Sequence, residues 1–150
     1  MTLSRIFGIA AFFTLALNSA PAFSDSNETH ASDMTRAHIA RAMVTTGVVD
    51  REPVDQVHSL MNDNSMVFFF TELMGMQGQT VTHRWAFNGQ VMGEVPFEVG
   101  GPRWRVWSTK NLESIWVGTW TVSVVDENGK VLQTEDFDYA NRALPASPAH

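Results

Sequence analysis

The pair Asn88-Gly89 separates two runs rich in β-branched and aromatic residues, at positions 80–87 and 90–97. An Asn-Gly pair in this setting is the strongest short-range sequence signal for a β-hairpin, because both residues accept the positive φ angles of a two-residue type I′ turn. Two glycines and a proline at 100–102 then interrupt the pattern, and a new strand is expected from Arg103. The centre of the chain should therefore fold as a hairpin followed by a further strand.

A two-residue turn at this position also sets the register of the hairpin, since residues whose numbers sum to 177 should lie opposite each other. Trp85 is then expected to face Met92, and His83 to face Glu94. Side chains alternate between the two faces of a sheet, so this register places His83 and Glu94 on one face and Arg84 on the other.

The rest of the chain also has strand composition and contains no clear helical period. Strands are expected at 39–49, 66–73, 103–109, 115–125 and 131–139, with a short edge strand within 54–60. Turn signals at near-regular spacing are typical of an all-β, immunoglobulin- or fibronectin-III-like two-sheet β-sandwich of about seven strands. A small closed barrel is the alternative.

The first residues have the order of a secretory signal peptide. In positions 1–24, Arg5 supplies a positive charge, an apolar run follows at 6–17, and small residues come next. The favoured cleavage site is before Asp25. Cleavage before Phe23 and an uncleaved membrane anchor are the alternatives.

This pattern predicts the organisation of the whole chain and its location. We expect a signal peptide at 1–24, a flexible leader at 25–35, a β-sandwich domain at 36–140 and a loose tail at 141–150. The mature protein should be periplasmic or secreted, with no membrane span after cleavage.

Composition excludes several classes of function. The chain has no cysteine, which rules out disulfides, a thiol nucleophile and lipidation at the cleavage site. Its formal net charge is −6, which argues against nucleic acid as a partner. The five histidines are scattered without metal-ligand spacing, and no glycine pattern is followed by a helix, so neither a metal nor a cofactor is expected.

Several separated motifs occur in one order along the chain: Val81-Thr-His-Arg-Trp, Asn88-Gly, Glu94-Val-Pro, Gly100-Gly-Pro-Arg-Trp-Arg-Val-Trp-Ser and Gly118-Thr-Trp. Arg51-Glu-Pro-Val and Phe69-Phe-Thr-Glu-Leu precede them. Together they resemble a bacterial domain family of unknown function, number 2914, over roughly residues 36 to 140. The resemblance implies an exported or membrane-associated protein and carries no activity to any residue.

The expected pairing of His83 with Glu94 is the first candidate for chemistry. A carboxylate beside an imidazole can orient a general base or a metal ligand. This pairing is the basis of the hypothesis that the protein is a hydrolase. The simpler reading is a cross-strand polar pair at the sheet surface, because one His and one Glu make neither a triad nor a closed metal site.

A set of arginines and a tryptophan is the second candidate. Alternation places Arg103, Arg105 and Trp107 on one face of their strand, and Arg84 joins them if the hairpin is the neighbouring strand. Such a cluster can bind a carboxylate or phosphate through paired N–H groups, with the indole stacking on a sugar or a guanidinium group. The alternative is packing, in which arginine stems cover core tryptophans and pair with glutamates.

We therefore expect a non-catalytic exported binding or adaptor module of the bacterial cell envelope. The alternatives are a carbohydrate- or anion-binding module that uses the Arg/Trp face, and a hydrolase that uses His83 and Glu94. An envelope protein or a glycan is the expected partner, and no cofactor is expected.

Overall fold

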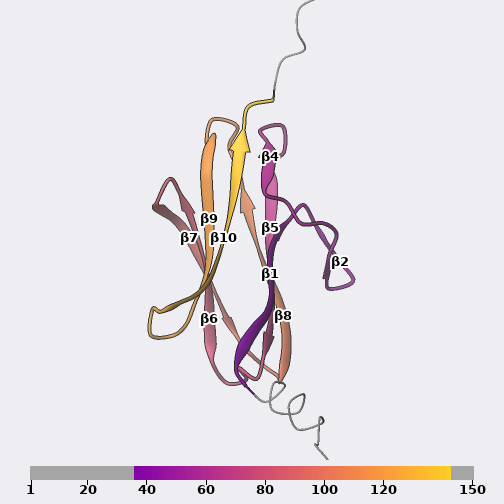
Figure 1. The fold of residues 1–150 in the computed structure, drawn as a ribbon, viewed down its shortest axis with the longest axis vertical. Coiled ribbons are helices and arrows are strands. Elements are labelled where there is room, and N and C mark those ends of the chain that lie inside the picture. The colour runs from indigo at the N-terminus through magenta and orange to yellow at the C-terminus, as the bar shows by residue number, and fades with distance from the viewer. Residues whose placement is uncertain (1–35, 143–150) are drawn as a thin grey trace, which may run out of the picture.

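The computed structural model describes residues 36–142, and every regular element among them is a β-strand (Figure 1). The predicted signal peptide and leader, and most of the predicted tail, lie outside the described residues. The strands are β1 (His38–Thr45), β2 (Val48–Val49), β3 (Glu52–Pro53), β4 (Ser59–Met61), β5 (Met66–Met74), β6 (Thr80–Phe87), β7 (Gln90–Glu98), β8 (Arg103–Asn111), β9 (Gly118–Val125) and β10 (Val131–Ala140).

The strands form two main sheets. One has the order β1-β5-β8 and the other β4-β10-β9-β6-β7, while β2 and β3, among the described strands, pair only with each other. Figure 1 shows the two sheets side by side, with the β2–β3 hairpin projecting from the three-stranded sheet on the side away from the five-stranded one. The predicted all-β sandwich is confirmed, and it consists of two separate sheets and not one closed barrel. The immunoglobulin or fibronectin type III topology stays a prediction.

The core lies between the two sheets because one face of each long strand is apolar. In β5, alternate side chains such as Val67, Phe69 and Leu73 are fully buried. They meet Trp85, Trp120 and other large side chains of the five-stranded sheet. Burial of aromatic surface on this scale stabilises the fold without any disulfide.

The β6–β7 hairpin has the predicted type I′ turn. Asn88 and Gly89 both have positive φ, 46° and 83°, and Phe87 pairs with Gln90 across the turn. Gly118 of β9 packs against this turn, where an added Cβ would lie 2.8 Å from the Asn88 side-chain oxygen. The predicted turn is confirmed.

The predicted register is wrong beyond the first two pairs. A β-bulge lies at Met92, so Trp85 pairs with Gly93. His83 consequently pairs with Val95, and Glu94 pairs with Arg84. One inserted residue moves every later side chain of the bulged strand to the opposite face.

The strand predicted at 39–49 is interrupted. β1 ends at Thr45, and the chain turns outward into the short β2–β3 hairpin. The tip of this hairpin is Asp50-Arg51, and both residues have positive φ, at 51° and 64°. Non-glycine residues pay for that conformation in steric strain, of the order of 1 kcal/mol or more each. No helix among residues 36–142 is long and apolar enough to cross a membrane.

Candidate functional site

The outer face of the three-stranded sheet carries Arg103, Arg105 and Trp107. They alternate along β8 with Trp104 and Val106, which pack against the core. The pairing of β8 with β5 then sets Arg105 beside Glu72 and Trp107 beside Phe70 on the outer side. Local alternation therefore brings two guanidinium groups and an indole to one surface, and long-range pairing supplies the glutamate and the phenylalanine between them.

Glu72 is the buried centre of this surface, with a side chain only 6% exposed. Arg41 of β1 donates from Nε to its Oε2 at 2.6 Å, and Nη2 lies 2.5 Å from the same oxygen. Arg103 donates to Oε1 from the other side. Burial alone would raise the pKa of Glu72, but the hydrogen bonds and positive charges of the two arginines outweigh it and hold the pKa below the ordinary value.

A second carboxylate, Glu52 of the β2–β3 hairpin, lies above the same face. Its Oε2 accepts from Arg41 Nη1 at 2.8 Å, and its Oε1 accepts from Arg105 Nη1. The hydrogen bond from Arg41, with its charge and that of Arg105, lowers the pKa of Glu52. We call Arg41, Glu52, Glu72, Arg103 and Arg105 the arginine–glutamate network.

Aromatic rings continue the surface beside the network. The Arg41 guanidinium lies over the Phe70 ring, 5.0 Å from its centroid, and Phe70 is fully buried beneath it. Trp107, one row further along β8, remains 36% exposed. A partly exposed indole beside guanidinium groups is suited to stacking on a flat polar ligand.

Arg84 does not join this surface, which corrects the expectation from the sequence. It lies on β6, in the five-stranded sheet, and its side chain points away from the core as His83 points into it. Arg84 Nε donates to Glu94 Oε1 at 2.6 Å. The two sheets turn opposite faces to solvent, so Arg84 and Arg103 lie on opposite sides of the sandwich.

His83 and Glu94 do not meet, which corrects the predicted polar pair. His83 is fully buried between the sheets, and its ring lies 4.7 Å from Phe69 and 4.8 Å from Phe97 between centroids. Glu94 is exposed on the outer face of β7. The bulge at Met92 separates them, because it shifts Glu94 by one position to face Arg84.

The partners of His83 are hydroxyl groups from the opposite sheet. Its Nε2 lies 3.0 Å from Thr71 Oγ1, and its Nδ1 lies 2.9 Å from Ser108 Oγ. Trp85 Nε1 donates to the same Ser108 oxygen at 3.0 Å, and Thr71 Oγ1 donates to the Val106 carbonyl at 3.4 Å.

These contacts form one consistent chain of hydrogen bonds. Trp85 is a donor only, so Ser108 accepts from it and donates to His83 Nδ1; His83 Nε2 then donates to Thr71. The imidazole is neutral in this arrangement, and burial lowers its pKa to about 3. Every buried side-chain nitrogen and oxygen of the described residues has a hydrogen-bond partner. The cluster therefore joins the two sheets through satisfied polar groups.

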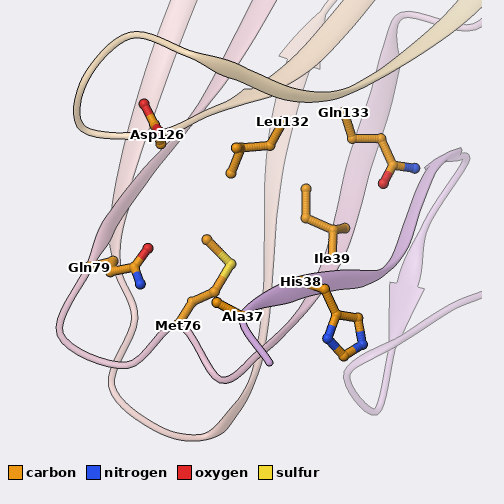
Figure 2. Close-up of a pocket in the computed structure, with 8 residues that line it drawn as sticks. All are labelled: Ala37, His38, Ile39, Met76, Gln79, Asp126, Leu132 and Gln133. Carbon is orange, nitrogen blue, oxygen red and sulfur yellow. The ribbon is translucent and has the colours of Figure 1, made fainter. Parts of the chain in front are cut away.

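A separate pocket of about 380 Å³ lies at one corner of the sandwich (Figure 2). Figure 2 shows Ile39, Met76 and Leu132 converging on the hollow, with the His38 ring turned away from it. Asp126 at its rim accepts two backbone N–H groups of its own turn at 2.9 Å. None of the candidate site residues lines this pocket. The carboxylate of Asp126 at its rim stabilises the turn that follows β9.

Sequence reasoning missed Arg41, Glu52 and Glu72. A signal for Glu72 exists, because a carboxylate within the apolar run of β5 requires a buried partner. The sequence around Arg41 and around Glu52 contains no signal that either residue belongs to the arginine–glutamate network. Among residues 36–142, no three His, Asp or Glu side chains gather as metal ligands.

The model of one protein family, described as protein of unknown function (DUF2914), matches residues 78–139. This part of the chain is similar to that family. The resemblance seen in the motifs is confirmed over these residues. No curated protein matches the chain.

The DUF2914 match runs from the turn before β6 to the end of β10. It includes His83 and Ser108 of the buried cluster and Arg103, Arg105 and Trp107 of the outer face. Arg41, Glu52 and Glu72 lie before it, so the network joins the DUF2914 segment to the preceding strands.

Proposed function

We propose that this protein is an exported, non-catalytic binding module of the bacterial cell envelope, and that the outer face of the three-stranded sheet is its binding surface. The observation that carries the proposal is the gathering of Arg103, Arg105 and the part-exposed Trp107 on that face. Export is proposed from the leader at positions 1–24.

The charge of this face supports an anionic partner. Three arginines and two glutamates give the network a formal charge of +1, on a chain whose net charge is −6. The Arg103 side chain is 57% exposed, and among residues 36–142 only its Nε is engaged, by Glu72. Its terminal nitrogens can therefore donate to a carboxylate or phosphate of an envelope protein or glycan.

The position of His83 supports a non-catalytic role. The imidazole and the Ser108 hydroxyl are in hydrogen-bond contact, as a nucleophile and its base would be. Both residues are buried, however, and the Ser108 oxygen also accepts from Trp85. This pair serves as a link between the sheets, and we assign it no reaction.

To test this function, tagged mature protein is incubated with periplasmic extract or with a panel of acidic and neutral oligosaccharides, and the amount of partner or oligosaccharide that it captures is measured. Arg103→Gln and Trp107→Ala should each weaken capture by about tenfold, the effect of losing one charged hydrogen bond or one stacking contact. Arg84→Gln is the matched control, because it removes the same charge from the opposite face and should leave capture unchanged.

Thermal melts of each variant separate binding from folding. Equal capture by the parent and both face variants would contradict the proposal. So would an equal loss in Arg84→Gln, because that result would show dependence on net charge alone.

A further inference from the structure

We propose that Arg41 and Arg105 form a carboxylate-binding fork, that Glu52 occupies it in the resting state, and that the carboxylate of an acidic sugar displaces Glu52. The inference rests on the proposed function and specifies its ligand. Glu52 belongs to the β2–β3 hairpin, so the hairpin would act as a displaceable cover over the binding face.

The geometry already contains a seated carboxylate. The two oxygens of Glu52 are shared between strands on opposite sides of β5: Oε2 faces Arg41 at 2.8 Å and Oε1 faces Arg105. They stand in for the two oxygens of a ligand carboxylate. The backbones of both arginines belong to one sheet, on the strands that flank β5, so the positions from which their side chains reach persist when Glu52 leaves.

Arg41 stays in place without Glu52. Its Nε and Nη2 remain bonded to Glu72, at 2.6 and 2.5 Å, and Glu72 is buried on the central strand. Only Nη1 is used for Glu52, and it is the atom that a ligand would take over. One glutamate of the network is therefore a fixed support and the other is an occupant.

The tip of the β2–β3 hairpin contacts the sheet through Glu52 and through a long hydrogen bond, 3.5 Å, from Arg105 Nη1 to the Arg51 carbonyl. The hairpin has two residue pairs, and its turn residues Asp50 and Arg51 both have positive φ. The Glu52 side chain is 46% exposed. The base of the hairpin, where the chain leaves β1 and returns after β3, is better fixed. There Asp55 accepts hydrogen bonds from Thr45 Oγ1 and from the Thr46 amide, each at 2.7 Å. The tip can therefore lift while the base stays attached.

The neighbouring aromatic group favours a sugar acid as the ligand. Trp107 lies two residues from Arg105 on the same face of β8, about 7 Å along the strand. A uronic acid places a carboxylate on a ring whose apolar face can stack on an indole. The fork would hold the carboxylate, and Trp107 the ring.

The experiment removes the seated carboxylate. Glu52→Ala should bind an oligouronate at least about tenfold more tightly than the parent in calorimetric titration, because the ligand no longer competes with Glu52. Glu94→Ala is the matched control: it breaks the Arg84 ion pair on the other sheet and should produce no gain. Adding Arg105→Gln to Glu52→Ala should abolish the gain.

Further arms identify the ligand and guard against misfolding. A neutral oligosaccharide should not bind the Glu52→Ala variant more tightly, and neither should a glutamate-rich peptide. Glu52→Gln, which keeps the side-chain shape, should show the same gain if Glu52→Ala unfolds.

Three outcomes would overturn the inference: no gain in affinity in a folded Glu52 variant, an equal gain in Glu94→Ala, or a gain for the peptide alone. The capture test of Arg103 and Trp107 uses residues outside the fork, so the proposed function can stand when the fork fails.

Discussion

His83 shows how burial determines the chemistry of a single residue. Its ordinary pKa of 6.5 falls to about 3 because the charged form would be desolvated between the sheets. The hydroxyl groups of Thr71 and Ser108 satisfy the neutral ring from both sides. The same imidazole at the surface would be a proton acceptor near neutral pH, but here it stabilises the fold in its neutral form.

This shift predicts how stability depends on pH. The folded-state pKa lies below the unfolded-state value, so the unfolded chain binds the extra proton between about pH 3 and 6.5. The contribution of His83 is complete above about pH 6.5 and decreases as pH falls, by about 1.4 kcal/mol per unit. Urea unfolding at pH 7, 6 and 5 should reveal this slope.

The matched variants for this prediction are His83→Gln and His38→Gln. His83→Gln should be less stable than the parent at pH 7 and should lose the slope. His38→Gln should retain it, since His38 lies outside the core and its ring, within the part of the chain that the structure describes, bonds only to the nearby Arg36 carbonyl. A parent whose stability is constant from pH 7 to pH 5 would refute the assignment.

At the scale of elements, the β6–β7 hairpin combines a turn that the sequence specifies with a bulge that it does not reveal. The Asn88-Gly89 turn follows from local conformational preference, and its φ angles match that preference. At the bulge, the Met92 carbonyl accepts a hydrogen bond from Lys110 Nζ of β8 at 2.9 Å. A contact between the two sheets thus accompanies the change of register.

Replacing the turn glycine tests the conformational part of this account. Gly89→Ala should lower the free energy of unfolding by about 1–2 kcal/mol, because φ is 83° and an L-residue is strained there. An added Cβ would meet no atom within 4 Å, so the cost is conformational and not steric contact with the fold.

Gly101→Ala is the control for that measurement. Its added Cβ would make only ordinary contacts, the nearest at 3.6 Å to the Trp104 ring, and its φ lies outside the positive range. Denaturant unfolding should place it within about 0.5 kcal/mol of the parent. Equal losses in the two variants would remove the special role of the turn.

At the scale of the whole molecule, the sandwich separates two kinds of polar group. The His83 cluster joins the sheets from within, and the arginine–glutamate network lies on the outer face of one sheet. In a chain without cysteine, packed aromatic surface and these polar links stabilise the fold together.

The proposed export makes a prediction about the whole chain. Intact-mass analysis of protein recovered from the periplasm should give the mass of residues 25–150, because the leader has the charge, apolar run and small residues of a cleaved signal. Protein expressed in the cytoplasm from a gene beginning at Asp25 supplies the reference mass, after allowance for its initiator methionine. A recovered mass that retains the apolar run at 6–17 would indicate an anchor and contradict the predicted cleavage.

The sequence alone determined the features that depend on near neighbours. The Asn88-Gly89 turn follows from the φ preferences of two residues, and the placement of Arg103, Arg105 and Trp107 on one face follows from the two-residue period of a strand. The regular spacing of strands and turns likewise predicted a two-sheet sandwich.

Only the tertiary structure decided which distant residues meet. The bulge at Met92 moved Glu94 away from His83, and a strand period contains no signal for one inserted residue. Arg41, Glu52 and Glu72 join the arginines of β8 because β5 pairs with both edge strands and the hairpin folds back over them. Strand order and register follow from the packing of the whole core, and residues far apart in sequence become neighbours only when that core is complete.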